Sequence, residues 1–591
     1  MVLTADSISS YLNGKLVGTA SKSRTTTDFG QNLLVYLGRS GYAKDQAFAG
    51  SMKDLRIYSD VLTQAQIQTA YESERAVYDS ENENTQNEPA GVTEYIPQIR
   101  RATDASSGLS HPGIGMSADQ LETMQRHVRA GDEPWFSGYG ALINNPKAAL
   151  NPRLFFQPDN DIFIHIPGPW AIEGYDNPGE FVSQRCQMDS LTAAHQALMW
   201  YITGNEQYRR NVFTILDNFA LVESAVDHTD FRFGDVVYNL CFAAEILRYT
   251  ECDNEELQWT QEDTDKLTGF MDIVHKFYDA TWFWMNQHSF NVLGMMGESI
   301  FTNDADMYGK AVERTLVNTE GEHGGRNGSV KYQIRKVVKN DLTGETLKEP
   351  NIQLMEMGRD QGHAYGNLGG LSELVASIYA QGTLVDPEEG TISTAANAVN
   401  PFEFQDDRLL AGASYLAKYH LGYEVTWIPA DSGVSSSSPN GIYKSINGYP
   451  WKGNLSNYYG IVYNYYKYIA KADMSQEKYR YVADAYESIM PEGASGDFIG
   501  LSTLMFTPEA AAADGISRKK DFSGDTETIS QTEYFSALRR GTAQVMKEGE
   551  TTFVRANAAG AGTEFVIHHF GYPRKGLVAL KVRSNGDARV R

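Results

Sequence analysis

The sequence is poor in cysteine, lacks long apolar runs and shows no leader pattern. It has only three cysteines, a low and odd number that rules out a disulfide framework. One disulfide, between Cys241 and Cys252, is still compatible with the sequence. No run approaches the roughly 20 apolar residues that a membrane-spanning helix needs. The residues after Met1 lack the basic and apolar regions of a signal peptide. We therefore expect a protein that neither depends on disulfides nor crosses a membrane.

Positive charge is also scarce. The chain has 51 Lys and Arg against 75 Asp and Glu, a net charge of −24. A field of this sign does not attract nucleic acid, and an acidic polymer would need a local basic groove. What is present is typical of a globular protein: 41% hydrophobic residues and 34 tyrosines. The length of 591 residues indicates two to four domains.

Residues 1–75 have the pattern of a β module. The turn Asn13-Gly14 between apolar runs predicts a hairpin, and further strands are expected over 33–38 and 50–58. A short helix is expected over 63–71. The pieces 11–18 and 50–63 resemble the second half of a laminin-G/concanavalin-like jelly roll. This resemblance implies a partial module that binds glycans, and a simple spacer is the alternative.

The remaining chain divides by composition into three parts. Residues 76–105 are acidic and polar, as in a linker, and residues 496–591 are β-rich. Between them, 106–495 is mostly helical, with a capping box predicted at Ser117 and Gln120. Amphipathic periodicity predicts further helices over 189–203, 205–222, 235–250, 261–280, 288–302, 305–319, 361–382, 403–420, 456–470 and 476–489.

Strands are expected near the end of the chain, over 552–555, 564–570 and 576–582. This part weakly resembles the opening of a carbohydrate-binding β-sandwich, and a sheet domain associated with the helical part is the alternative. We expect both ends of the chain to be cut within a module. The sequence itself does not prove secretion, but a cut N-terminus leaves room for a lost signal, and we expect an extracellular or periplasmic protein.

Two segments of the helical part hold the candidate chemistry. The first, 282–291, places His288 beside the amides of Asn286 and Gln287, which can hydrogen-bond a carboxylate without adding an acid. A purely structural buried histidine is the alternative interpretation. The second, 356–366, supplies Arg359, His363 and Tyr365.

The second segment also has a simpler interpretation. Glu356 and Asp360 flank Arg359 at the expected start of a helix. Acidic side chains are favourable at the N-terminus of a helix, and ion pairs with the arginine would stabilise this end of the helix. The residues alone leave a structural network and a catalytic site equally open.

The helical part resembles the alginate-lyase-like polysaccharide lyases with an α/α-toroid fold, nearest to the alginate and glucuronan lyases of polysaccharide lyase family 38. The most specific match is Gly-Arg-Asp-Gln-x-His at 358–363. Supporting matches are His-Pro-Gly-Ile at 111–114, 130–135 with Gly138-Tyr139, Trp-Tyr-Ile-Thr-Gly-Asn at 200–205, and 407–410 with 417–422. The resemblance implies a central all-α (α/α)n toroid flanked by partial β-sandwich modules.

The resemblance also implies a reaction, β-elimination at a uronic acid. Removal of the C5 proton builds an enolate on the carboxylate, whose charge must be neutralised. By the family pattern, Arg359 and either Gln287 or Asn286 hold the carboxylate, and His288 is the base for one stereochemistry of the substrate. Tyr365 protonates the O4 leaving group, and in syn elimination also removes the C5 proton. His363 orients or neutralises. Relatives often have an asparagine directly before the histidine; here that place is Gln287.

Additional substrate contacts are expected from a basic stretch. Residues 320–350 are rich in glycine and then in Lys and Arg, and Arg326 and Lys331 are the subsite candidates; a solvated loop is the alternative. Trp200 is a candidate for sugar stacking, with core packing as its alternative. No metal motif is present, so no cofactor is expected, and surface calcium sites stay open.

Two other functions are compatible with the sequence. A glycoside hydrolase on the same fold would use paired carboxylates such as Asp189 and Asp235 and would yield saturated products. A non-catalytic glycan-binding protein would bind without turnover. The leading hypothesis is a lyase of alginate-like or glucuronan-like polyuronates. The uronate, the endo or exo mode and the oligomeric state do not follow from the sequence.

Overall fold

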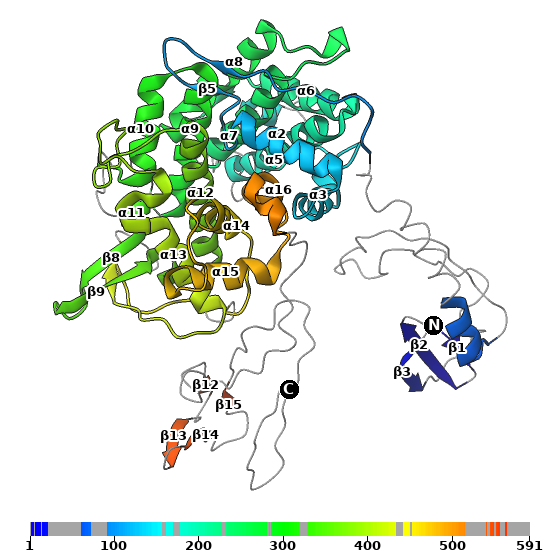
Figure 1. The fold of residues 1–591 in the computed structure, drawn as a ribbon, viewed down its shortest axis with the longest axis vertical. Coiled ribbons are helices and arrows are strands. Elements are labelled where there is room, and N and C mark those ends of the chain that lie inside the picture. The colour runs from blue at the N-terminus through cyan, green and yellow to red at the C-terminus, as the bar shows by residue number, and fades with distance from the viewer. Residues whose placement is uncertain are drawn as a thin grey trace. The chain divides into compact units, whose positions relative to one another are not determined.

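The computed structural model divides the chain into two units, 1–90 and 91–591, which are described separately. Each unit is described in part (Figure 1). The described residues are 2–4, 6–12, 15–21, 61–71, 91–156, 161–168, 178–226, 231–279, 283, 285–319, 328–432, 441–448, 452–514, 539–540, 544–548, 551–555 and 562–563.

The described part of the first unit is a small antiparallel sheet and a helix. The strands β1 (Val2–Leu3), β2 (Ser7–Leu12) and β3 (Lys15–Ser21) pair in that order, with a register shift between Ser10 and Tyr11. The predicted hairpin is confirmed, because β2 and β3 flank the expected Asn-Gly turn. The helix over 64–71 matches the expected one. The strands expected over 33–38 and 50–58 lie outside the described residues.

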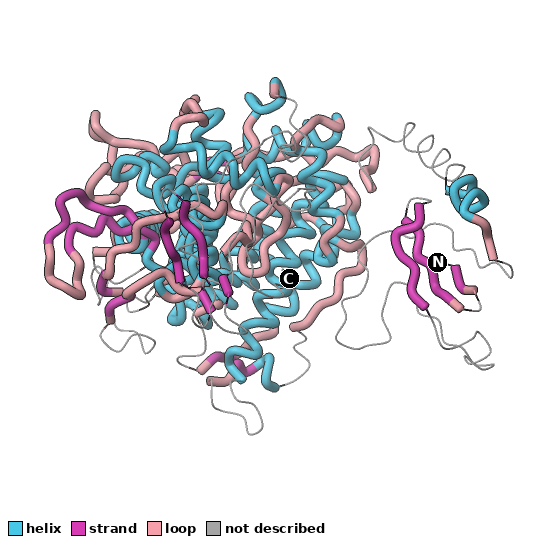
Figure 2. The backbone as a smooth tube through the Cα atoms, turned by 90° about the horizontal axis from the view of Figure 1, so that it is seen from below, coloured by secondary structure: helices cyan, strands magenta, loops and turns pink. Residues whose placement is uncertain are grey.

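The second unit is mostly helical (Figure 2). All ten helices predicted from periodicity are confirmed, with bounds that differ by a few residues except that the first begins earlier. They are α5 (Pro178–Thr203), α6 (Glu206–Ala220), α7 (Phe233–Arg248), α8 (Gln261–Tyr278), α9 (Asn286–Thr302), α10 (Ala305–Leu316), α12 (Gln361–Ala380), α13 (Phe404–His420), α14 (Gly460–Asn464) with a π-helical turn to Ile469, and α15 (Glu477–Ile489). The capping box at Ser117 is confirmed at the start of α2 (Ala118–Ala130).

Four helices, α5, α7, α9 and α12, pack in succession and run in the same direction. On α5 and α7, Gln187 bonds Asp235, and one turn later Ser190 bonds Asn239. The helices α6, α8 and α10 pack against their outer sides (Figure 1). Because the four run in parallel, their N-terminal ends lie at the same end of the unit. The segments expected to hold the site are at the starts of α9 and α12. Closure of the helices into a toroid stays a prediction.

The close packing of α7 on α9 depends on two glycines. A Cβ added at Gly294 would lie 2.7 Å from the Cα of Gly234 and 2.8 Å from the ring of Tyr278. Distances this short exclude any side chain there. The glycines therefore set how near the two helices, and the side chains at their starts, can approach each other.

The helical unit extends beyond the boundaries predicted from composition. Thr93 and Arg100, placed in the linker, donate backbone hydrogen bonds to Thr203 and Tyr249. At the other end, Trp135 donates to the carbonyl of Thr507 at 3.0 Å. Tertiary contacts thus bring parts of 76–105 and of 496–591 into the helical unit, and composition could not reveal those contacts.

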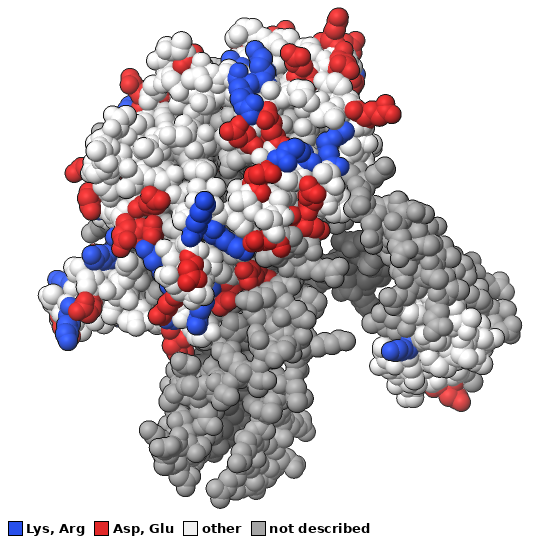
Figure 3. Space-filling model, viewed as in Figure 1, with Lys and Arg blue, Asp and Glu red and all other residues white. Residues whose placement is uncertain are grey.

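Part of the basic stretch 320–350, which was expected to contact the substrate, forms a hairpin. The strands β8 (Ile334–Lys339) and β9 (Thr346–Leu354) pair in antiparallel fashion and project from one edge of the unit (Figure 1). In Figure 3 the tip of this hairpin carries both basic and acidic side chains. Lys339 and Glu345 are exposed at this tip, and Lys336 is exposed nearer the base of the hairpin. The base of the hairpin, by contrast, leads through the turn Met355–Gly358 into α12.

The remaining described elements confirm some expectations. The strand β14 (Thr551–Arg555) matches the expected strand over 552–555 and pairs with β13 (Gln544–Glu548). The strands expected over 564–570 and 576–582 lie outside the described residues. Cys186, Cys241 and Cys252 are buried free thiols, so the bridge left open above is not formed. Among the described helices, none is long and apolar enough to cross a bilayer.

Candidate functional site

The starts of α9 and α12 meet through one buried carboxylate. Glu356, fully buried in the turn before α12, accepts a hydrogen bond from the backbone N–H of Asn286 at 3.0 Å. Its other oxygen pairs with Nη1 of Arg359 at 3.2 Å. The same Nη1 lies 3.5 Å from the side-chain oxygen of Asn286. The structure thus brings together an amide and a guanidinium that are separated by 73 positions in the chain.

A third donor completes the surroundings of this carboxylate. Gln333, at the base of the β8–β9 hairpin, donates from Nε2 to Glu356 at 3.1 Å and accepts from the Glu356 N–H at 2.9 Å. Burial acts to raise the pKa of Glu356, and Arg359 and the N–H of Asn286 act to lower it. All three neighbours are donors, and a carboxylate can accept from all of them. Sequence reasoning treated Glu356 only as one partner in an ion pair.

The backbone immediately before α9 is strained. Met285 has φ 56° and ψ −141°, a conformation that residues with a side chain rarely adopt. Its side chain is buried and lies against Gln333, whose Nε2 is 3.0 Å from the sulfur. Strain of this kind persists only where the surrounding packing enforces it, and such positions gather at functional sites.

His288 lies in the first turn of α9 and is 1% exposed. Its Nε2 lies 2.7 Å from the carbonyl oxygen of Arg314 and must carry the proton to donate to it, so Nδ1 holds the lone pair. Nδ1 is buried and has no hydrogen-bond partner within the described part of the chain. Burial lowers the pKa of His288 to about 4. The imidazole is therefore neutral at pH 7, the form that a base requires.

Tyr365 lies in the first half of α12 with its ring buried. Its hydroxyl donates to the carbonyl of Asn454 at 3.1 Å and lies 2.9 Å from the hydroxyl of Tyr459, while the ring packs against His420. Burial raises the pKa of Tyr365 well above its usual range. The phenol is thus protonated at neutral pH and suits a proton donor. Its hydrogen bonds go to groups other than His288, so the convergence of these residues on one sugar stays a prediction.

His363, in the first turn of α12, is partly exposed and bonds Asp360. Its Nδ1 lies 2.6 Å from one carboxylate oxygen, and its backbone N–H donates to the other at 2.9 Å. The ion pairs expected at the start of this helix are therefore present, but they are two separate pairs. Glu356 pairs with Arg359, and Asp360 pairs with His363.

Two further charged residues lie near this end of the unit and were missed from sequence. The carboxyl of Asp497 is exposed, yet crowding by protein atoms raises its pKa, and the charges of Arg232 and His363 act to lower it. Arg232 precedes α7, so the three groups come from three separate parts of the chain. Phe498, next to Asp497, stacks on Phe290 of α9 at 5.1 Å. No local pattern marks such a contact.

The other predicted residues fall in different places. Gln287 is half-buried, beside Asn286. Lys331 is half-buried with its ammonium 5.8 Å from the centre of the Tyr332 ring, and Arg326 lies outside the described residues. The structure corrects the assignment of Trp200 to a sugar subsite. Its ring is fully buried and its Nε1 donates to Thr250 at 3.2 Å, so it belongs to the core.

The carboxylates considered for a hydrolase are structural. Asp189 is 1% exposed and accepts from the backbone N–H groups of Phe155 and Phe156 at 2.8 to 3.0 Å. Asp235 is equally buried and accepts from Gln187 at 2.9 Å. Side chains held in this way are poorly placed to flank a glycosidic bond. The structure thus disfavours this pair as the acid and base of a hydrolase.

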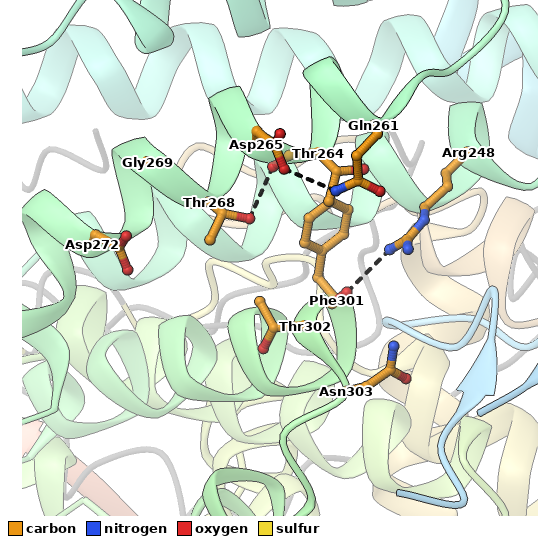
Figure 4. A pocket seen from close by; sticks show the side chains of 10 residues that line it. All are labelled: Arg248, Gln261, Thr264, Asp265, Thr268, Gly269, Asp272, Phe301, Thr302 and Asn303. Carbon is orange, nitrogen blue, oxygen red and sulfur yellow. Dashed lines mark hydrogen bonds between the residues drawn. The ribbon is translucent and has the colours of Figure 1, made fainter. Parts of the chain in front are cut away.

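A pocket of about 380 Å³ lies at the opposite end of the helices (Figure 4). Arg248, at the end of α7, and Thr302 and Asn303, at the end of α9, line it together with Thr268 of α8. None of the predicted site residues contributes to it. Among the described residues, no cluster of three or more His, Cys, Asp or Glu is arranged to hold a metal ion.

Comparisons with known proteins bear on both units. A model of the concanavalin A-like lectin/glucanases superfamily matches residues 1–68. The solved alginate lyase A1-III from Sphingomonas species A1 has 10% identity and a TM-score of 0.39 over 67% of this chain and 98% of its own. An alginate lyase from Bacteroides ovatus has 12% identity and a TM-score of 0.40 over 68% of this chain and 100% of its own.

A variant of A1-III complexed with tetrasaccharide has 12% identity and a TM-score of 0.37, over 67% of this chain and 96% of its own. The chain is similar to alginate lyases. A search of curated proteins finds no match. The resemblances predicted from the motifs, to a concanavalin-like module and to alginate lyases, are thus confirmed as resemblances. Identities and TM-scores this low say nothing of substrate or mechanism.

Proposed function

We propose that the chain is a polysaccharide lyase that cleaves a uronic-acid-containing polysaccharide, such as alginate or glucuronan, by β-elimination. The observation that supports this most is the contact between Asn286 and Arg359 at the joined starts of α9 and α12. An amide and a guanidinium are donors suited to a carboxylate, and the two helix N-termini add positive partial charge. A uronate carboxylate is the anion whose charge grows during elimination.

The proton transfers are assigned to His288 and Tyr365. The neutral imidazole removes the C5 proton through Nδ1, which the hydrogen bond from Nε2 to Arg314 leaves unprotonated. The electron pair moves into the carboxylate as an enolate, which Arg359 and Asn286 stabilise. Collapse of the enolate breaks the C4–O4 bond, and the protonated phenol of Tyr365 gives its proton to O4. The product has a C4–C5 double bond, and no step needs a metal.

The location and the accessory units fit this role. A polymeric acidic substrate of this kind is met outside the cytoplasm, so we place the protein in the extracellular or periplasmic space. The concanavalin-like residues at the N-terminus are proposed to bind glycans. His363 and Lys331 are proposed as substrate contacts beside the site, and Arg326 keeps that role as a prediction from sequence.

The test is a panel of acidic polysaccharides incubated with the purified chain. We expect an unsaturated product that absorbs in the ultraviolet, whereas a hydrolase would give saturated ends. Tyr365→Phe and His288→Ala should each lower kcat about 100-fold or more, the usual contribution of a positioned acid or base. Circular dichroism should show both variants folded. Full activity in both would refute the assignment, and binding of a polyuronate without any turnover would favour the non-catalytic alternative.

A further inference from the structure

Glu356 occupies an unusual position for a group that does not face the substrate. It is fully buried, 70 positions from Asn286, and belongs to neither helix that it connects. One oxygen accepts from Asn286 and Gln333, and the other from Arg359. The carboxylate therefore holds the start of α9, the base of the β8–β9 hairpin and the guanidinium before α12 at one point.

We propose that Glu356 is a positioning residue, which fixes the Arg359 guanidinium against Asn286 so that both act on the same substrate carboxylate. This inference rests on the proposed function and deepens it. The shared atom is Nη1 of Arg359, which lies between the Glu356 carboxylate and the Asn286 amide oxygen. Without an anchor, a long arginine side chain samples many rotamers, and its alignment with the amide is lost.

The anchor requires an ionised carboxylate of this length. Its three neighbours donate hydrogen bonds, and an amide in its place would turn one NH₂ donor toward another donor. The charges that face Glu356 are Arg359, which favours its ionised form, and Asp360, which opposes it. Glu356→Gln thus removes the charge at constant size, whereas Glu356→Asp keeps the charge and withdraws it by one methylene.

The experiment compares these two variants with Glu245→Gln in the full chain. Glu245 is a matched control because its carboxylate is also buried and paired with a basic side chain, 3.0 Å from Nδ1 of His111, in the second half of α7. We expect Glu356→Gln to lower kcat/KM for polyuronate about 100-fold, the scale of a misplaced catalytic group. Glu356→Asp should recover part of this loss. Glu245→Gln should lower thermal stability and leave kcat/KM of the folded fraction unchanged.

Binding separates positioning from simple loss of stability. In the Tyr365→Phe background, calorimetry measures affinity for an oligouronate of the polymer that the unaltered chain cleaves. Adding Glu356→Gln should weaken this affinity at least tenfold while the protein stays folded. Equal affinity with and without Glu356→Gln, or equal kcat/KM losses in Glu356→Gln and Glu245→Gln, would overturn the inference.

A structural readout decides the inference independently of turnover. In a crystal structure of Glu356→Gln, we expect the Arg359 guanidinium to have left Asn286. A guanidinium still in contact with that amide would refute a positioning role. If the unaltered chain cleaves no polyuronate, the proposed function fails, and this structure alone decides whether Glu356 holds Arg359. If Glu356→Gln does not fold, Glu356→Asp takes its place in each measurement.

Discussion

At the start of α9, two adjacent side-chain amides differ in what they touch. Asn286 contacts Arg359 through its side-chain oxygen and Glu356 through its backbone N–H. Gln287 follows on the next position of the helix, turned by about 100 degrees, and is only half-buried. The sequence could not choose between them as the carboxylate ligand, because both types of amide suit that role. The ion-pair network now favours Asn286.

This choice predicts different outcomes for two single substitutions. Asn286→Ala should lower kcat/KM for polyuronate about 100-fold, since one donor to a developing oxyanion contributes on that scale. Gln287→Ala should change kcat/KM by no more than about twofold, as expected for a substitution away from the network. Steady-state rates of unsaturated product, with melting temperatures as a check of folding, measure both. A larger loss in Gln287→Ala would move the amide role to that residue.

At the scale of elements, periodicity predicted helices well because each buries a continuous apolar stripe. The ten helices predicted from periodicity follow the expected segments within a few residues at most ends. The base of the β8–β9 hairpin was missed, because its contact with Glu356 depends on residues brought together only by folding. For the same reason the sequence supplied Arg359 and Asn286 as candidates, but Arg232 and Asp497 were not found. The hydrophobic pattern of the sequence thus locates helices and strands, whereas the packing of distant segments decides which side chains come into contact.

The spacing between α7 and α9 offers a test at this scale. Gly294→Ala places a methyl group against Gly234 and Tyr278, and overpacking of this kind should cost about 1–3 kcal/mol of unfolding free energy. Gly269→Ala is the matched control, because no atom lies within 4 Å of the added Cβ in α8. A helical alanine there should stabilise by about 0.5–1 kcal/mol. Denaturant unfolding measures both, and equal effects would contradict the close helix packing.

For the whole molecule, a net charge of −24 must be reconciled with the acidic substrate that we propose. On the face of the molecule that Figure 3 shows, basic and acidic side chains are interspersed. The protein field at a distance therefore does not draw the polymer in, and attraction must arise at short range from groups such as Arg359 and the helix N-termini. A proposed glycan-binding module at the N-terminus would offset this weak attraction by raising the local concentration of substrate.

Buried titratable groups also set how the stability of the whole helical unit depends on pH. Burial raises the pKa of Glu373 to about 8, against 4.5 in an exposed chain. The native state then holds more protons than the unfolded state, so stability falls as pH rises from 4.5 to 8. Burial lowers the pKa of His195 and His288 to about 4, against 6.5. For these groups the unfolded state holds more protons, so stability falls as pH drops from 6.5 to 4.

The melting temperature should therefore be highest between pH 4.5 and 6.5, where the two effects oppose each other. Glu373→Gln should flatten the alkaline decline, because its amide can still accept from the N–H of Gly500 without ever becoming charged. His195→Asn should flatten the acidic decline, because no imidazole remains to bind a proton on unfolding. Calorimetric scans across this pH range compare both variants with the unaltered chain. An alkaline decline as steep in Glu373→Gln as in the unaltered chain would show that Glu373 is ionised at neutral pH, and its burial would then have to be balanced by contacts stronger than the hydrogen bond from Gly500.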